Sequence, residues 1–299
     1  MKYLTYEINS EMSYGVLVDE NNILPLKPII QEFGLNNAPD LLSFIRQYNI
    51  QTVNDILEAL PRYAEQMIPL NSVKLLSPIP YPRRNIFCVG KNYAEHAAEI
   101  ANIGASNSSI PKEPIYFSKV ADPAIGDGSL ISIRSEFASL LDYETELVIV
   151  IGKDGKDIAE EEADNYIFGY AIGNDISARD IQNKKLQWFK GKSLDNAAVI
   201  GPWIVSKDEF TLPLELNISS KVNGEIRQQS NTKNLIFNIA HIISDLSQGL
   251  TLRAGDLIMT GTPAGVGIAM DPLGVLKSGD VVECKIAGIG TLINEVKFI

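Results

Sequence analysis

The sequence predicts a β-rich α+β protein in which a small α+β module precedes a larger domain. Short runs of β-branched apolar residues that end at glycine predict strands, and residues 148–151 are the clearest of them. The predicted helices are few and short. Pro78–Pro82 forms a stiff, extended connector. We therefore divide the chain into a module of residues 1–75 and a domain of residues 80–299.

The composition is that of an ordinary globular protein, with 45% hydrophobic and 21% charged residues among 299. The 26 basic and 37 acidic side chains give a net charge of −11, and no basic cluster interrupts this excess. We therefore expect neither nucleic acid nor an anionic membrane as the main partner.

The cysteines and the first residues indicate where the protein works. Cys88 and Cys284 are too few for a disulfide framework, and Cys88 lies in an apolar run, so buried free thiols in a reducing compartment are expected. The first seven residues lack the apolar core of a signal peptide, and no apolar run is long enough to span a bilayer. We expect a cytoplasmic protein.

The leading module contains turn and helix signals but no residues arranged for chemistry. Residues 14–18 and 23–26 flank a polar turn and predict a hairpin. Asp40 is placed to cap a helix over residues 41–48, and a second helix is predicted over residues 53–60. We interpret this segment as a structural or oligomerisation module.

After the connector, a strand over residues 85–89 leads through a glycine turn into a short helix over residues 94–101. His96 and Glu99 are three residues apart and therefore lie on one face of that helix. A carboxylate fixes the orientation of an adjacent imidazole, which suits a general base that activates water. A surface ion pair is the alternative. Residues 102–109 are small and polar and predict a mobile loop, so the helix could act as a lid.

The stretch from Leu141 to Gly152 predicts a buried strand that begins with carboxylates. Side chains alternate along a strand, so Glu144 and Glu146 point the same way, with Asp142 in line at the mouth. Adjacent carboxylates repel each other and lose hydration when buried, and a divalent cation would remove both penalties. The alternative is that this end of the strand is exposed and solvated.

A second apolar strand, over residues 169–176, contains a third carboxylate, Asp175. A separation of about thirty residues suits a helix between two neighbouring strands. Oxygen ligands from Glu144, Glu146 and Asp175, with the remaining positions left to water or substrate, match an octahedral Mg²⁺ or Mn²⁺ site. Zinc is less favoured, because the chain has only two histidines and two cysteines.

Several hydrogen-bond donors lie near these carboxylates in the sequence. Arg179, Gln182 and Lys192 follow Asp175 within twenty residues and could bind a carboxylate or a developing enolate. Lys119, at the polar end of a strand predicted over residues 114–119, is added to the candidate substrate contacts.

Residues 256–267 predict a strand that enters a glycine-rich loop. The loop lacks the lysine and the spacing of a nucleotide-binding P-loop, and we expect it to bring backbone N–H groups and Thr262 to a small anionic substrate. His241 lies on an amphipathic helix predicted over residues 238–248 and is interpreted as structural. Two hairpins are also predicted, over residues 214–227 and 279–292.

Five motifs in sequence order resemble those of the fumarylacetoacetate hydrolase family over about residues 80–299. They are Val89–Tyr93 with His96 and Glu99, Asp142–Glu146, Asn174–Asp175 with Arg179, Asp180 and Gln182, Gly191–Ser193, and Thr260–Gly267. Each motif is weak alone, but five in this order are specific. The resemblance implies a mixed β-sandwich roll, usually a homodimer, that uses Mg²⁺ or Mn²⁺.

The resemblance also implies roles for individual residues. It places the metal on Glu144, Glu146 and Asp175, as the strand pattern does independently. It implies that His96 and Glu99 form a catalytic pair on a lid and that Lys192 lies on the oxyanion side. It implies substrate contacts for Arg179, Gln182 and Thr262.

Among family branches, the chain looks most like bacterial-type members that process acylpyruvates, oxaloacetate or hydroxy-dienedioates. We expect a small anionic 2-oxo acid whose C–C bond breaks through an enolate that the metal and Lys192 stabilise. Hydrolysis of an acylpyruvate-type substrate, with His96 and Glu99 delivering hydroxide, is the first expectation. Oxaloacetate decarboxylation and keto–enol isomerisation at the same site stay open. A non-catalytic descendant that binds a metabolite or a protein, and a purely structural acidic protein, are the alternatives from other classes.

Overall fold

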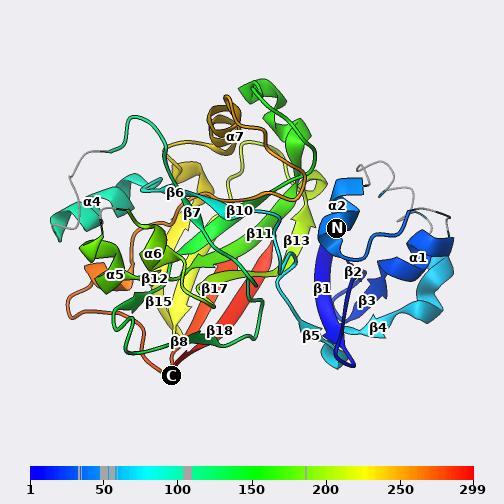
Figure 1. Ribbon diagram of the computed structural model, residues 1–299, viewed down its shortest axis with the longest axis horizontal. Helices are drawn as coiled ribbons and strands as arrows, with labels where there is room; N and C mark the ends of the chain where they lie inside the picture. The colour runs from blue at the N-terminus through cyan, green and yellow to red at the C-terminus, as the bar shows by residue number, and fades with distance from the viewer. Residues whose placement is uncertain are drawn as a thin grey trace.

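A computed structural model of the chain describes residues 1–32, 34, 36–47, 53, 58, 60–103, 110–185 and 187–299. Within these residues, an 11-stranded mixed sheet and a 5-stranded sheet carry most of the fold, and short helices lie around them (Figure 1). Strands of the smaller sheet contact the middle strands of the larger one, as in a sandwich. The predicted β-rich α+β class with a mixed sandwich is confirmed.

The larger sheet runs from the leading module into the rest of the chain. Its strand order is β4-β3-β2-β1-β13-β11-β10-β16-β6-β7, with β5 paired to β1. Within the described residues, neighbouring strands of this sheet are antiparallel except for the parallel pair β16 and β6. Its strands are β1 (Lys2–Ile8), β2 (Glu11–Leu17), β3 (Asn22–Pro25), β4 (Ile68–Pro69), β5 (Lys74–Leu75), β6 (Ile86–Gly90), β7 (Ile115–Lys119), β10 (Thr145–Ile151), β11 (Ile167–Asp175), β13 (Ala198–Ser206) and β16 (Leu257–Met259).

The smaller sheet has the order β15-β14-β17-β18-β8, with a parallel pairing between β18 and β8. Its strands are β8 (Ile131–Ile133), β14 (Asn217–Val222), β15 (Glu225–Asn231), β17 (Val281–Ile286) and β18 (Gly290–Phe298). Two short strands, β9 (Leu141–Asp142) and β12 (Ser177–Ala178), pair with each other.

The helices are short. The α-helices are α1 (Leu26–Glu32), α2 (Leu41–Gln47), α4 (Ala94–Asn102), α5 (Arg179–Lys184), α6 (Phe189–Lys192) and α7 (Ile239–Ser247). The 3₁₀ turns are η1 (Leu60–Gln66), η2 (Leu70–Ser72), η3 (Glu160–Tyr166), η4 (Lys207–Glu209), η5 (Thr232–Asn234) and η6 (Gly267–Ala269). Helices α4, α5 and α6 gather at the end of the molecule away from the leading module (Figure 1). None of the described helices has the length and apolar character needed to cross a membrane.

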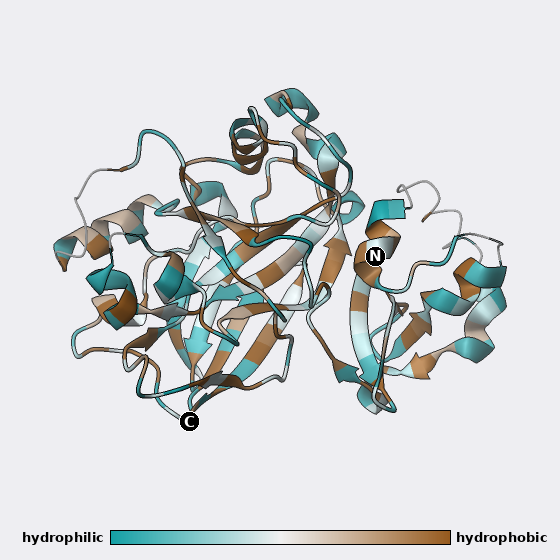
Figure 2. Cartoon of the chain, viewed as in Figure 1, coloured by the Kyte–Doolittle hydropathy of each residue, from teal (hydrophilic) through white to brown (hydrophobic). Residues whose placement is uncertain are grey.

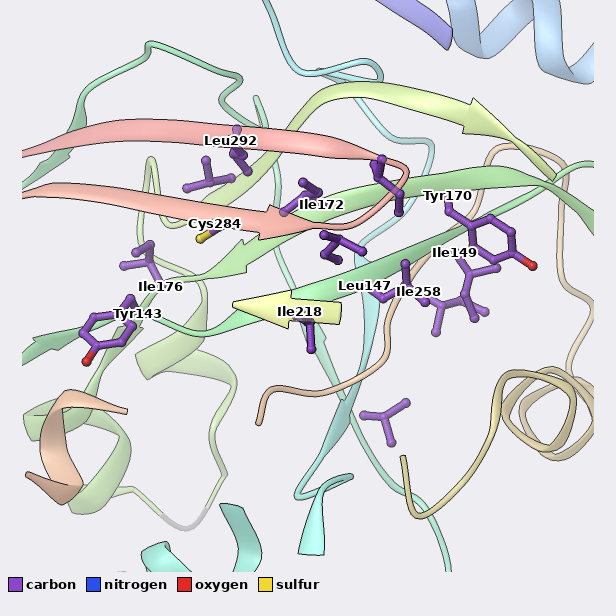
Figure 3. Close-up of a cluster of buried hydrophobic side chains, with 14 of the residues drawn as sticks. Tyr143, Leu147, Ile149, Tyr170, Ile172, Ile176, Ile218, Ile258, Cys284 and Leu292 are labelled. Atoms are coloured by element: carbon purple, nitrogen blue, oxygen red, sulfur yellow. The ribbon is translucent and has the colours of Figure 1, made fainter. Parts of the chain in front are cut away.

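Strand β10 lies at the centre of the core and is buried along its whole length. Because side chains alternate along a strand, Leu147 and Ile149 point into the core between the two sheets, whereas Val148 and Val150 point to the opposite face. Figure 3 shows Leu147, Ile149 and Ile218 of β14 among the side chains of this core. Hydrophobic residues recur along these central strands (Figure 2). Burial on both faces explains why this stretch is an unbroken apolar run.

The leading module shares a sheet and a core with the rest of the chain. Strand β1 pairs with β13, with Tyr3 opposite Ile204. The ring of Tyr3 lies 4.9 Å from that of Phe168, in β11. The connector is also packed in place, since the carbonyl of Pro78 accepts a hydrogen bond from Thr5 Oγ1 at 2.7 Å. The boundary between residues 75 and 80 therefore stays a prediction.

The predicted hairpins of residues 14–26, 214–227 and 279–292 form as β2–β3, β14–β15 and β17–β18. Strands β10 and β11 are neighbours, as expected, but they are antiparallel and the segment between them contains the 3₁₀ turn η3 rather than an α-helix. The helix predicted over residues 53–60 and the loop over residues 102–109 lie largely outside the described residues.

Candidate active site and metal centre

Three carboxylates meet where β10 and β11 pair. Thr145 lies opposite Asn174 in the antiparallel register, which places Glu144 beside Asp175, and the Asp175 N–H donates to the Glu144 carbonyl at 2.9 Å. Glu146 follows two residues later and so shares a face with Glu144. Oxygens of Glu144, Glu146 and Asp175 all lie within 4.8 Å of one another, and the three residues are buried. The alternative of a solvated strand end is therefore wrong.

Three basic side chains surround this carboxylate cluster. Lys192 Nζ donates to Glu144 Oε2 at 2.6 Å and to Asp175 Oδ2 at 2.7 Å. Arg179 makes an ion pair with Glu144 Oε1 at 2.7 Å, and Lys119 makes one with Asp175 Oδ1 at 2.7 Å. The charges of the cluster are thus partly balanced from within the protein.

Glu146 has the least compensation. Burial is the largest influence on its pKa, followed by the charges of Asp175 and Glu144, and together they raise it well above its ordinary value. The charge of Lys192 and one N–H donor, from Gly261 at 2.7 Å, oppose this rise without cancelling it. Buried carboxylate oxygens with incompletely balanced charge are the donors that Mg²⁺ and Mn²⁺ prefer. The residues present therefore fit a hard divalent cation.

Glu144 and Lys192 are held in their charged forms. Burial would raise the pKa of Glu144, but Lys192 and Arg179 outweigh it and lower the pKa to about 2. Burial would likewise lower the pKa of Lys192, but Asp175 and Glu144 raise it above its ordinary value. Lys192 is therefore an ammonium ion at neutral pH and supplies positive charge rather than a base.

Lys119 is placed differently from its predicted role as a substrate contact. It is fully buried, and its Nζ donates to the carbonyls of Ile176 and Lys192 and pairs with Asp175. The ammonium group thus makes two hydrogen bonds to carbonyls and one ion pair, all inside the protein. Lys119 thus orients Asp175 from behind the cavity, because the strand end that the sequence placed at a polar tip lies in the interior.

His96 and Glu99 lie on one face of α4, as predicted. His96 Nδ1 is 2.7 Å from Glu99 Oε1, and Glu99 Oε2 accepts the Gly265 N–H at 2.9 Å. The His96 side chain is 8% exposed, which excludes the surface ion pair considered from the sequence. Glu99 therefore holds the imidazole in one orientation and links α4 to the glycine-rich loop.

The glycine-rich loop serves the protein's own carboxylates. The N–H groups of Gly261, Gly265 and Gly267 donate to Glu146, Glu99 and Asp142. We expected these groups to face a substrate, and the difference arises because buried carboxylates need donors. Gly261 and Gly265 have φ of +102° and +105°, a region that favours glycine.

Asp142 supports the site without joining the cluster of three carboxylates. One of its oxygens accepts the N–H of Gly267 at 2.7 Å, and the other accepts Arg179 Nε at 2.9 Å. Arg179 in turn donates to Gln182 Oε1 at 3.0 Å. Arg179 therefore joins Asp142 to Glu144, since it pairs with both.

These residues line one cavity. Of the candidates named from the sequence, its walls include His96, Glu144, Glu146, Arg179, Gln182, Lys192 and Thr262. Asp175 and Lys119 lie fully buried beneath them. The sequence did not single out the apolar wall, which contains Val89, Ile100, Phe117, Trp188 and Ile268. Trp188 packs against Gly90, which has no side chain. A Cβ at Gly90 would lie 2.3 Å from the indole, so this contact requires glycine there.

Comparison with known proteins identifies the family of this chain. Residues 85–297 match the fumarylacetoacetate (FAA) hydrolase C-terminal family. The chain belongs to this family. Members of the family are enzymes, among them hydrolases, isomerases and tautomerases.

One relative by sequence and two solved structures are informative. Over 99% of this chain and all of the other, the protein is 39% identical to the oxaloacetate tautomerase YisK of Bacillus subtilis. It matches the structure of a fumarylacetoacetate hydrolase from Exiguobacterium antarcticum with a TM-score of 0.83 at 36% identity over all of both chains. It also matches a maleylpyruvate hydrolase from Sphingobium, solved with manganese(II) and pyruvate, with a TM-score of 0.79 at 27% identity over 100% and 99% of the chains.

Proposed function

We propose that this protein is a divalent-metal-dependent enzyme that interconverts the keto and enol forms of oxaloacetate or a closely related 2-oxo acid. One arrangement carries the proposal: a buried carboxylate cluster, the Lys192 ammonium and the His96–Glu99 pair belong to a single cavity. The full-length similarity to an oxaloacetate tautomerase supports this choice of reaction.

Glu144, Glu146 and Asp175 would hold Mg²⁺ or Mn²⁺. Such an ion, when bound, polarises the keto group of a 2-oxo acid and so favours loss of the neighbouring proton. Lys192 adds a fixed positive charge beside Glu144 and Asp175, where negative charge develops on the substrate oxygen. Because this ammonium group is already in place, it needs no reorganisation during the reaction.

His96 is placed to move the proton. Its ring lines the cavity, and Glu99 engages Nδ1, which leaves Nε2 as the ring nitrogen available for proton transfer. Removal of the C3 proton of oxaloacetate and return of a proton to the enolate oxygen complete the isomerisation without a further reactant. Glu99 contributes by fixing the ring and by stabilising the imidazolium that forms transiently.

A second candidate is hydrolysis of an acylpyruvate-type substrate. The apolar wall that includes Phe117 and Trp188 offers an acyl group a surface to pack on, and the maleylpyruvate hydrolase is a structural neighbour. In this reaction His96 would take a proton from water rather than from C3. Oxaloacetate decarboxylation needs no proton acceptor, and a non-catalytic descendant would turn over none of these substrates.

The test uses three assays with Mg²⁺, with Mn²⁺ and with a chelator: ultraviolet absorbance of enol-oxaloacetate, pyruvate release from oxaloacetate, and acylpyruvate cleavage. We expect metal-dependent tautomerisation that His96→Ala lowers by roughly 10²- to 10⁴-fold and Glu99→Gln also lowers. His241→Ala is the matched control, because His241 lies on α7, where it pairs with Glu160 of η3 away from the cavity.

Each other outcome contradicts the proposal in a defined way. Metal-dependent pyruvate release that survives His96→Ala would identify a decarboxylase. Acylpyruvate cleavage that requires His96, without tautomerisation, would identify a hydrolase. Absence of all three activities would contradict the proposed reaction and favour the non-catalytic descendant.

A further inference from the structure

Gln228, in β15 of the smaller sheet, is fully buried beneath the cavity and has four hydrogen-bond partners. Its Oε1 accepts the Thr145 N–H at 3.1 Å and the Ser220 hydroxyl at 3.0 Å. Its Nε2 donates to Thr262 Oγ1 at 2.7 Å and to the Pro263 carbonyl at 2.8 Å. A peptide N–H can only donate and a carbonyl can only accept, so these partners fix the orientation of the amide.

The Thr145 carbonyl and the Gln228 amide together determine what the Thr262 hydroxyl can offer. A hydroxyl has one hydrogen and two lone pairs. Thr262 donates its hydrogen to the Thr145 carbonyl at 3.0 Å, and one lone pair accepts from Gln228. One lone pair therefore remains, and a ligand that reaches this oxygen meets an acceptor and no donor.

The same amide also holds the peptide that carries the carboxylates. Thr145 lies between Glu144 and Glu146, and its N–H and carbonyl point to Gln228 and Thr262. Gln228 thus joins the smaller sheet to the start of β10 and to the glycine-rich loop. Since all its hydrogen-bonding capacity is used, a change at this residue must alter at least one of these connections.

We propose that Gln228 is a positioning residue that makes Thr262 an acceptor, so that the site favours a ligand with a hydroxyl hydrogen at this position over one with a carbonyl oxygen. This inference rests on the proposed function, in which the two forms of the substrate differ in this respect. The enol has an O–H that can donate to Thr262, whereas the keto oxygen would face a lone pair. The arrangement therefore selects the enol form of a 2-oxo acid.

Lactate and pyruvate test this selection without turnover. Both are three-carbon monoanions at neutral pH, and they differ in carrying a hydroxyl or a keto group next to the carboxylate. Dissociation constants are measured by calorimetry with Mg²⁺ present for wild type, Thr262→Val, Gln228→Met, the double variant and Ser220→Ala.

We expect Thr262→Val to weaken lactate relative to pyruvate by roughly three- to tenfold, the range for one lost hydrogen bond. Gln228→Met should shift the ratio in the same direction, because it removes the acceptor of the Thr145 N–H as well as the donor to Thr262, so the Thr145 carbonyl no longer fixes the Thr262 hydrogen. The double variant should show no shift beyond that of Thr262→Val. Ser220→Ala, which removes a partner of Gln228 but none of Thr262, should keep the wild-type ratio. Thr262→Ser should keep it as well.

An unchanged ratio in Thr262→Val would overturn the acceptor role of Thr262. A changed ratio in Thr262→Val with a wild-type ratio in Gln228→Met would overturn the role of Gln228. If Gln228→Met does not fold, Thr262→Val and Thr262→Ser still decide the acceptor role. The dissociation constants are measured without turnover. A shifted lactate-to-pyruvate ratio in a protein that does not tautomerise oxaloacetate would therefore contradict the proposed function but support the preference for a hydroxyl over a carbonyl ligand.

Discussion

Glu144 and Glu146 carry the same side chain two positions apart, yet their surroundings shift their pKa values in opposite directions. Lys192 and Arg179 pair with Glu144, and its pKa falls to about 2 despite burial. Glu146 is buried beside Asp175 and Glu144, and its pKa rises. Ionised Glu144 thus stabilises the fold above its ordinary pKa and loses this contribution as the pH falls toward 2. The raised pKa of Glu146 shows that its carboxylate lacks a balancing positive charge.

The two cysteines should be unreactive in the folded protein. Cys88 and Cys284 are buried, and burial raises the pKa of both thiols, that of Cys284 to about 12. Thiolate is the reactive form and is scarce at pH 8 when the pKa is this high. Titration with a chromogenic disulfide reagent should therefore detect no thiol in the native protein and both thiols in urea. Fast reaction of either thiol without denaturant would contradict this placement.

At the scale of elements, the glycine-rich loop has a conformation that its neighbours enforce. A Cβ on Gly265 would lie 2.0 Å from the Arg227 carbonyl oxygen, at a φ of +105°. The loop can therefore approach β15 only with glycine at this position. This close approach brings the Gly265 N–H to Glu99 and so supports the orientation of His96.

Gly265→Ala should destabilise the protein by about 3 kcal/mol or more, from the sum of backbone strain and overlap. Gly279→Ala is the matched control, because Gly279 also has a positive φ but nothing lies within 4 Å of the position that a Cβ would take there; its cost should be about 1 kcal/mol. Urea unfolding of both variants measures the difference. Equal costs would show that the loop does not pack against Arg227 as described.

The sequence allowed the carboxylate cluster to be predicted, because alternation along a strand and the end of the next strand are local properties. It did not reveal the burial of Lys119, the role of Asp142 or the use of the loop N–H groups. Each of these depends on a partner more than fifty residues away or on a neighbouring strand, such as Lys119 with Asp175 and Gly267 with Asp142. Gln228 gave no signal, since one glutamine directly after a predicted hairpin has many ordinary explanations.

At the scale of the whole molecule, the leading module behaves as part of the core. Strand β1 was not predicted as a strand, and it is the element that pairs the module with β13. Tyr3 is fully buried between Phe44 of α2 and Phe168 of β11. The module therefore extends the larger sheet beyond β13 and packs against Phe168 of β11. The predicted homodimer and the predicted absence of nucleic acid and membrane partners stay predictions.

Tyr3→Ala should destabilise the whole protein, by about 3–5 kcal/mol as for other buried aromatic residues, and unfolding should remain a single transition. Tyr81→Ala, at a tyrosine that is 56% exposed in the connector, should change the stability by less than about 0.5 kcal/mol. Chemical denaturation followed by circular dichroism and by fluorescence measures both. Two separate transitions in Tyr3→Ala would indicate that the module folds independently.

The proposed enzyme depends most on a divalent cation that Glu144, Glu146 and Asp175 would hold. Titration of the metal-free protein with Mn²⁺, followed by the electron paramagnetic resonance signal of free Mn²⁺, tests it directly. We predict one bound Mn²⁺ per chain. Binding should be weaker by roughly tenfold or more in Glu146→Gln, because glutamine keeps the shape of the side chain but removes its negative charge. Glu161→Gln, at an exposed glutamate in η3, should bind as wild type does. Equal binding by wild type and Glu146→Gln, or none by wild type, would contradict the assignment of the metal centre.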